Sequence, residues 1–336
     1  MFRPFLILLV ALLLLPAPQS AKEARTMPGA LLIKAKPVPL NASDPTQRTA
    51  GQLEYLAGWE LKSDHRSFGG ISAMVLRPDG RIIALNDSGD LFGLPLPGDA
   101  GGRKEFIAPL PVRPEESHWP KWKWDSEGLM HDPVSGRYWV TFELIQRICR
   151  YSPAFARVEA CSEPKAMEDW PGTDGAEAAV RLPDGRFLIF AESAYGSKGS
   201  TEVLLFTGDP VEPGARPVHL GYHAPQGYRI TDAVWIGNDK LLTLNRRTTI
   251  FDGFTAKLAL VDISDLRPGS LLQASEITSL RPPLLADNFE ALAVSREQER
   301  DIVWIASDDN HQFFQRTLLL KFAMKHAAIA AALSGH

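Results

Sequence analysis

A hairpin of fixed composition recurs five times along the chain and limits the folds that it can form. Each copy has a small or acidic start, an apolar strand, an Asp-Gly-like turn, a second apolar strand and a polar end. The copies cover residues 68–89, 125–143, 174–193, 231–247 and 287–310. They recur about every 50 to 57 residues, a period typical of propellers and solenoids. Strands without helical periodicity favour the propeller.

We therefore predict an all-β fold, a β-propeller of four-stranded blades. Five blades can be counted, and a sixth would have to be degenerate. One further strand, Leu53 to Leu61, precedes the first copy, and only one strand, Thr317 to Met324, follows the last hairpin. Because propellers usually close by joining both termini in one blade, we expect the Leu53 strand to complete the final blade.

The two ends of the chain lie outside the predicted propeller. Residues 1–21 have a basic start at Arg3, an apolar run over residues 5–15 and small residues before Lys22, which together are typical of a secretory signal peptide. The run is shorter than the roughly 20 residues that span a bilayer, so we expect cleavage rather than a membrane anchor. We predict an N-terminal extension over residues 22–50, the propeller over residues 51–324, a C-terminal tail over residues 325–336, and a periplasmic or secreted protein without a stable membrane span.

Charge and cysteine content narrow the class of protein further. The formal net charge is −4, which provides no broad basic face and argues against nucleic-acid binding. Cys149 and Cys161 flank what we expect to be the third and fourth strands of one blade. In an oxidising compartment a disulfide is the favoured interpretation, and two buried free thiols are the alternative.

Acids gather at one mouth of the predicted channel, because the innermost strand of each blade starts at one face and the second strand returns to it. The strand-start positions are Ser72, Glu127, Glu177, Asp232 and Glu290. The strand-return positions are Asn86, Asp87, Glu143, Glu192, Asn245, Asp308, Asp309 and Asn310.

Oxygen-rich clusters without His or Cys suit Ca²⁺, which takes six to eight oxygen ligands. We therefore predict a calcium site with the ligands Glu127, Glu177, Asp232, Glu290, Asp308 and Asn310. The alternative for any single acid is a structural role, holding turns and neighbouring blades by hydrogen bonds. We assign that role to Asp79, Asp132 and Asp184, which lie in the turns at the opposite end.

Basic and aromatic residues are expected near the same mouth. Arg246 and Arg247 end the second strand of their repeat, and Lys121 and Lys123 alternate with tryptophans over residues 119–124. Cations beside a carboxylate-bound metal make a site for anionic esters such as phosphates. Salt bridges from these arginines to the carboxylates are an equal alternative, and for the tryptophans a hydrophobic plug is the favoured interpretation. There is no Gly-x-Ser-x-Gly sequence for a serine nucleophile.

Several of these stretches together resemble the bacterial esterase-like phytase family. They are residues 53–61, Phe68-Gly-Gly-Ile-Ser72, Asp125-Ser-Glu-Gly-Leu129, Asp287-Asn-Phe-Glu-Ala-Leu292 and Ser307-Asp-Asp-Asn310. The resemblance covers roughly residues 53–324. It implies an exported β-propeller related to phytase-like and esterase-like hydrolases, and propeller phytases use several Ca²⁺ ions and basic side chains to hold inositol phosphates.

The residues and the resemblance lead to one functional hypothesis. We predict an exported, calcium-dependent hydrolase of phosphoric or carboxylic esters, with Glu127, Glu177, Arg246 and Arg247 as catalytic residues and a small, anionic ester as substrate. A propeller that binds a ligand or a partner protein without catalysis is one alternative, and a lactonase-like hydrolase is another.

Overall fold

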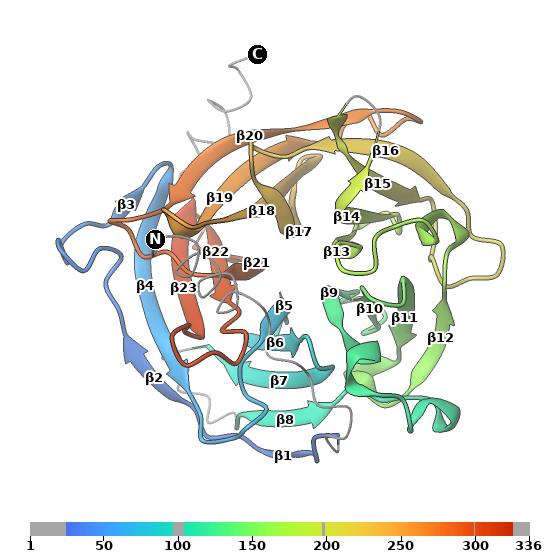
Figure 1. Ribbon diagram of the computed structural model, residues 1–336, viewed down its shortest axis with the longest axis horizontal. Coiled ribbons are helices and arrows are strands. Elements are labelled where there is room, and N and C mark those ends of the chain that lie inside the picture. Colours follow the sequence, from blue (N-terminus) through green and yellow to red (C-terminus); the bar gives the residue numbers. More distant parts are fainter. Residues whose placement is uncertain (1–24, 97–103, 197–198, 299, 325–336) are drawn as a thin grey trace, which may run out of the picture.

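Five antiparallel sheets stand around a central channel in the computed structural model, which describes residues 25–96, 104–196, 199–298 and 300–324 (Figure 1). The innermost strands are β5, β9, β13, β17 and β21, and each lies between two of the others, so the ring is closed. This confirms the predicted propeller, and the described residues form five blades.

Each of the first four blades is a meander that runs outward from the channel. Blade 1 contains β5 (Ile71–Leu76), β6 (Arg81–Asn86), β7 (Asp90–Pro95) and β8 (Phe106–Pro109), and blade 2 contains β9 (Ser126–His131), β10 (Tyr138–Phe142), β11 (Arg147–Tyr151) and β12 (Val158–Ser162). Blade 3 contains β13 (Ala176–Arg181), β14 (Phe187–Tyr195), β15 (Thr201–Phe206) and β16 (Pro217–His223), and blade 4 contains β17 (Arg229–Gly237), β18 (Lys240–Thr249), β19 (Gly253–Asp262) and β20 (Leu271–Leu280). The outer strands β16 and β20 also pair in parallel, which links blades 3 and 4.

Blade 5 closes the ring with strands from both ends of the chain. It contains β21 (Phe289–Glu297), β22 (Arg300–Ser307) and β23 (Leu318–Met324), followed by β4 (Leu53–Lys62). Leu320 lies opposite Gly58 in this antiparallel pairing, so the expected closure by the Leu53 strand is confirmed.

The N-terminal extension adds short strands to the outer edges of two blades. In the extension, β1 (Gly29–Ala30) pairs with β8 of blade 1, and β2 (Lys34–Pro37) and β3 (Thr49–Ala50) pair with β4 of blade 5. These pairings cover sheet edges that would otherwise present unpaired backbone groups. The predicted signal peptide and C-terminal tail lie outside the described residues.

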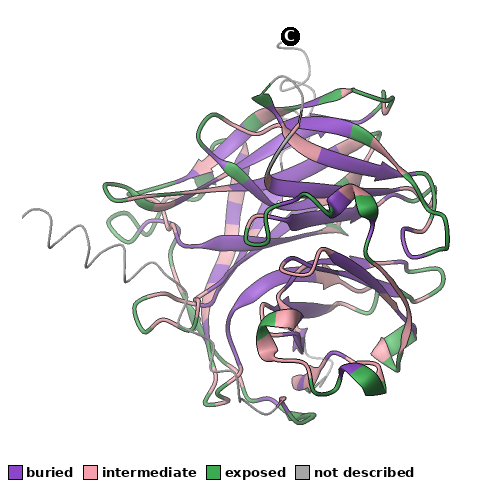
Figure 2. Cartoon of the chain, turned by 45° about the vertical axis from the view of Figure 1, so that its right-hand side comes forward, coloured by how far each residue is buried: buried purple, intermediate pink, exposed green. Residues whose placement is uncertain are grey.

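Side chains alternate between the two faces of each blade, and so the core is divided into five clusters, one between each pair of neighbouring blades. On β22, Val303 and Ile305 pack toward blade 4, whereas Ile302 and Trp304 pack toward blade 1. Figure 2 shows the resulting pattern, in which buried strands are joined by exposed loops.

The turns at the far end of the blades have the structural role that the sequence predicted. The carboxylate of Asp79 accepts from the backbone N–H of Arg81 at 3.2 Å, and that of Asp184 accepts from Arg186 at 3.0 Å. The carboxylate of Asp132 accepts from the Ser135 hydroxyl at 2.7 Å. Each acid therefore holds its own turn.

The disulfide lies on the outer hairpin of blade 2. Cys149 on β11 is directly opposite Cys161 on β12, and their sulfurs are bonded. The predicted disulfide is thereby confirmed, and such a bond fits an oxidising compartment.

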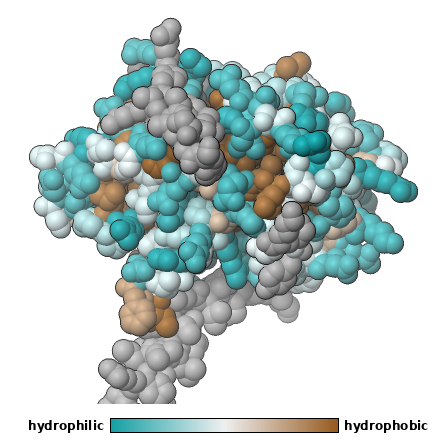
Figure 3. All heavy atoms as spheres, turned by 90° about the horizontal axis from the view of Figure 1, so that it is seen from above, coloured by the Kyte–Doolittle hydropathy of each residue, from teal (hydrophilic) through white to brown (hydrophobic). Residues whose placement is uncertain are grey.

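Short 3-10 helices lie in the loops of the described residues, among them η1 (Pro114–Glu116), η2 (Lys121–Trp124), η3 (Pro153–Phe155) and η4 (Lys165–Met167). No helix in the described part of the chain is both long and apolar enough to cross a membrane. On the side seen in Figure 3, hydrophobic residues form small patches within a mostly hydrophilic surface.

Candidate functional site

One residue near the start of every inner strand has no partner on the neighbouring strand. In blade 3, Ala176 pairs with Ala191 and Ala178 pairs with Phe190, so Glu177 between them is the extra residue of a β-bulge. The equivalent residues in chain order are Ser72, Glu127, Glu177, Thr231 and Glu290. Bulges redirect a side chain out of the regular alternation, and here they repeat at one level around the channel mouth.

This register corrects the sequence alignment of the fourth repeat. We aligned Asp232 with the three glutamates, but the bulge residue of blade 4 is Thr231. The Thr231 hydroxyl donates to the carbonyl of Phe289 in blade 5 at 3.3 Å, and the Ser72 hydroxyl donates to the carbonyl of Ser126 in blade 2 at 2.6 Å. Three bulge positions therefore carry acids, and two carry hydroxyls that join neighbouring blades.

Asp125, Glu127 and Glu143 of blade 2 form a group that we call the carboxylate trio. Each offers one oxygen that lies within 4.8 Å of the other two. The hairpin explains their meeting, because the backbone N–H of Glu143, just after β10, donates to the carbonyl of Asp125, just before β9, at 2.9 Å. The Glu143 carboxylate also accepts from the backbone N–H of Gly175 at 3.0 Å.

The trio lies beside other acids, with Glu143 buried and Asp125 and Glu127 half-buried, and this shifts its protonation. Burial, followed by the charges of Asp87 and Glu290, raises the pKa of Asp125 to about 7. Burial and then Asp125 raise the pKa of Glu143 to about 8. For Glu127, burial and the charges of Glu177 and Asp125 hold the pKa well above its usual value. Among the described residues, the main charges acting on the trio are all carboxylates.

A second group of acids surrounds Arg246, which follows the buried part of β18. Its guanidinium donates to the carboxylate of Glu290, to the side-chain oxygen of Asn288 at 2.8 Å and to Glu192 at 3.2 Å. Burial alone would lower the pKa of Arg246, but Glu290, Glu177 and Glu192 raise it above its usual value. Glu192 also accepts from Arg229 at 3.1 Å. In this half of the mouth, arginines offset part of the carboxylate charge, although burial still raises the pKa of Glu192 and of Glu290.

Glu177 lies between the trio and the group around Arg246, and Asp308 lies beside Glu290. Burial, then Glu192 and Glu143, hold the pKa of Glu177 well above its usual value, and Arg246 acts in the opposite direction. For Asp308, burial and the charges of Glu290 and Asp87 raise the pKa well above the usual value. Both therefore belong to the acidic mouth, as we predicted from the repeat.

Three of the predicted site residues point elsewhere. The carboxylate of Asp232 accepts from the backbone N–H of Leu292 in blade 5 and of Ala233, both at 2.7 Å, and burial raises its pKa well above the usual value. The amide of Asn310 donates to Gln315 at 2.9 Å. Arg247 pairs with Asp252 at 3.1 Å and lies 4.9 Å from the ring centre of Tyr228. These contacts hold the strands and loops around the mouth.

Two tryptophans of the segment beside the mouth pack against the protein, whereas Trp122 is exposed. Trp124 is buried, its ring centre lies 5.5 Å from that of Trp119, and the Lys123 ammonium lies 4.3 Å from the Trp119 ring centre. The contacts support the interpretation as a hydrophobic plug.

Sequence reasoning did not propose Asp125 and Glu143 as ligands, although it placed Glu143 among the strand-return residues. The signal that would have identified them is the hairpin itself, since pairing of its two strands brings the residue before the first next to the residue after the second.

Comparison with models of known protein families identifies the family of this chain. A family model described as "Phytase-like: Esterase-like activity of phytase" matches residues 66–311, which is more than half of the chain. The chain belongs to this phytase-like family. The matched residues of this phytase-like protein span the trio and the Arg246 group, and the description of the family indicates hydrolase activity.

No curated protein matches the phytase-like chain. Among solved structures, it is similar to the one titled "Crystal structure of Nidogen/Laminin Complex", with 10% identity, a TM-score of 0.43 and coverage of 80% of this chain and 94% of the other. It is also similar to "Crystal structure of RRP9 WD40 repeats", with 8% identity, a TM-score of 0.40 and coverage of 82% and 100%.

Proposed function

We propose that this protein is an exported, calcium-dependent hydrolase of phosphoric or carboxylic esters that acts at the acidic mouth of its channel. The observation that carries the proposal is the contrast between the two halves of the mouth. Arg246 balances Glu192 and Glu290, whereas the main charges acting on the trio are carboxylates. Buried carboxylates in such a group need a cation or shared protons.

The donor set of the trio fits calcium. It consists of hard carboxylate oxygens within 4.8 Å of one another, without sulfur or imidazole. Asp125, Glu127 and Glu143 would hold the ion, with Glu177 beside them. In place of the six predicted ligands, we thus propose a site centred on blade 2. A bound cation would supply a Lewis acid for the ester and for water.

The residues around the trio have roles that follow from their charges. Glu177 lies between the trio and Arg246, where its carboxylate would accept the proton of the attacking water. The water oxygen forms the new bond to phosphorus or carbon, the ester bond breaks, and the proton passes from Glu177 to the leaving alkoxide. Arg246 holds Glu290 and Glu192 in place and stabilises the anionic product by its charge.

The proposal is tested with purified protein, metal analysis and three substrates. We expect bound calcium, and hydrolysis of p-nitrophenyl phosphate or p-nitrophenyl acetate that a chelator abolishes and calcium restores. Glu127→Gln and Glu143→Gln should reduce calcium affinity and turnover together, while Asp184→Asn, in an exposed turn, should change neither. A simple lactone as the third substrate detects the lactonase alternative. Hydrolysis of none of them, with or without calcium, would leave a binding protein.

A further inference from the structure

The end of the channel opposite the carboxylates opens into a separate cavity of about 680 Å³. All five inner strands line it with their second halves, together with the turns that follow them. Its volume lies within the range of small-molecule sites. The mouth described above is formed by the starts of these strands, so the two sites lie at opposite ends of the channel.

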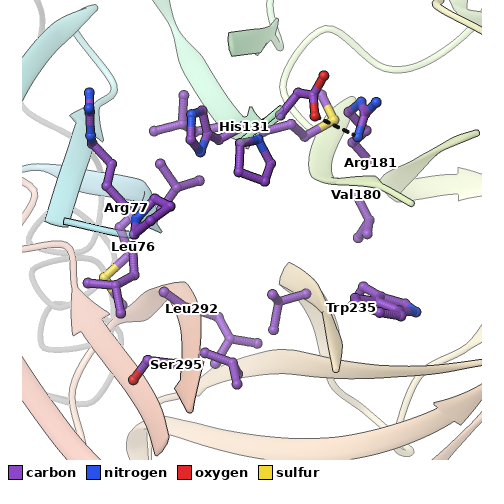
Figure 4. A pocket seen from close by; sticks show the side chains of 18 of the residues that line it. Leu76, Arg77, His131, Val180, Arg181, Trp235, Leu292 and Ser295 are labelled. Carbon is purple, nitrogen blue, oxygen red and sulfur yellow. Dashed lines mark ion pairs between the residues drawn. The ribbon is translucent and has the colours of Figure 1, made fainter. Parts of the chain in front are cut away.

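Apolar side chains form much of the wall of this cavity, which Asp132, Asp232 and Glu297 also line. Val180 of blade 3, Leu292 of blade 5 and Trp235 of blade 4 border its open centre (Figure 4). Trp235 is 39% exposed, although its indole is among the largest apolar groups of the chain. Because exposed apolar surface in a concave site is a common mark of ligand binding, the wall favours an apolar body as occupant.

Two arginines from different blades stand at the rim. Arg77 follows β5, and its guanidinium donates to the Tyr138 hydroxyl at 3.2 Å and lies 3.5 Å from Asp79. Arg181 ends β13 and lies 3.3 Å from Asp132 (Figure 4). A guanidinium has five N–H donors, so these contacts leave donors on each for a further anion.

His131 adds a polar group to the rim near the two arginines. His131 lies at the rim, with its ring centre 4.4 Å from that of Tyr138. Burial and then Arg77 lower the pKa of His131, Asp132 acts in the opposite direction, and Arg181 lowers it again. The imidazole is therefore neutral near neutral pH, and it adds a hydrogen-bonding group to a rim on which the cations come from the arginines.

We propose that this cavity binds an amphipathic anion. The apolar body, an aromatic ring system or a short alkyl chain, lies between Val180, Leu292 and Trp235. The anionic group, a carboxylate, sulfonate or phosphate, lies at the rim that carries Arg77 and Arg181. This site is independent of the proposed hydrolysis, since none of the carboxylates assigned to that reaction lines it.

The test uses the purified protein and 8-anilinonaphthalene-1-sulfonate, a fluorescent probe with an apolar body and one sulfonate. We expect saturable binding with one probe per chain. Trp235→Ala and Arg77→Gln should each weaken it about tenfold. Phe251→Ala removes a side chain that is 98% exposed, and Arg267→Gln removes an exposed arginine that pairs with Asp265. Both controls should leave binding unchanged.

Competition identifies the class of ligand. Decanoate and decyl phosphate should both displace the probe, and whichever binds more tightly identifies the anionic group. Decanol, which has no charge, should compete at least about tenfold more weakly. Equal displacement by decanol would overturn the anionic half of the proposal. Binding that is not saturable, or that falls as much in Phe251→Ala as in Trp235→Ala, would overturn the site. If Trp235→Ala does not fold, Arg77→Gln still tests the site, because Arg77 lies at the rim.

Discussion

At the scale of single residues, the acids of the channel mouth differ in what balances their charge. Glu290 and Glu192 receive hydrogen bonds from Arg246. Glu127 has Glu177 and Asp125 as its main charged neighbours. Replacing glutamate with glutamine should therefore have opposite effects on the free energy of unfolding in the two halves of the mouth.

Glu127→Gln should stabilise the calcium-free protein, because it removes a half-buried group that must otherwise hold a proton or repel its neighbours. Because an uncompensated polar group in such a place costs about 1 to 3 kcal/mol, we expect a gain in unfolding free energy of that size above neutral pH. Glu290→Gln should lower it by a similar amount, about 1 to 3 kcal/mol, because Arg246 loses a charged partner. Urea unfolding with a chelator measures both, and equal signs would contradict the division of the mouth.

The pH dependence of the calcium-free protein follows from the raised pKa values. The folded pKa of Asp125 is about 7 and that of Glu143 about 8, both above the usual values of 3.8 and 4.5. Between the usual pKa of each group and its folded pKa, the folded state binds more protons than the unfolded state. The free energy of unfolding is therefore highest below the usual pKa values and falls as the pH rises through the folded pKa values. Thermal melts from about pH 5 to about pH 9 should show this fall. Saturating calcium should flatten it, and a flat curve without calcium would argue against a buried trio.

At the scale of strands, the β-bulges explain how side chains of the inner strands reach the mouth. One extra residue per inner strand takes a side chain out of the alternation that fills the core, and it does so at the same level in every blade. Where that residue is Ser72 or Thr231, the hydroxyl joins the next blade, and where it is glutamate, the side chain enters the acidic group.

The outer hairpin of blade 2 should depend on its disulfide. Replacing Cys149 and Cys161 with serine opens a loop with a sequence separation of 12. The loss in unfolding free energy should be about 2 to 4 kcal/mol, since the bond restricts the unfolded chain. Denaturant titration of the double variant against the oxidised protein checks this, and reaction of two thiols in the non-reduced protein with a thiol reagent would contradict the bond.

At the scale of the whole molecule, closure of the ring depends on one strand from the N-terminal side. β4 pairs with β23 on one side and with β2 on the other. Its Leu53 and Tyr55 are buried in the cluster between blades 4 and 5. Without β4, blade 5 would end at an unpaired apolar strand.

Deletion of residues 51–62 should therefore cause aggregation rather than a mild loss of stability, because it exposes the edge of β23 and part of the core. Size-exclusion chromatography and thermal melting of the truncated protein measure this. A control deletion of residues 325–336 should stay monodisperse. A soluble, cooperatively unfolding protein without β4 would show that the ring closes in another way.

The sequence by itself determined the repeat, the propeller, the closing strand and the cysteine pair. These depend on patterns that are local or periodic, namely apolar alternation, Asp-Gly turns and a regular spacing of hairpins. It also indicated that Glu127, Glu177, Glu290 and Asp308 meet at one mouth, because every repeat starts and returns at the same face.

Only the tertiary structure decided how these acids divide between the carboxylate trio and the group around Arg246. A bulge moves the register by one residue, and a shift of one residue sends a side chain to the other face of a strand. Thus Thr231 rather than Asp232 occupies the fourth bulge position. The choice of partners by Arg246 likewise depends on distances between separate blades. Nor does the spacing of any one strand reveal the apolar cavity at the far mouth, because five strands from all parts of the chain contribute its wall.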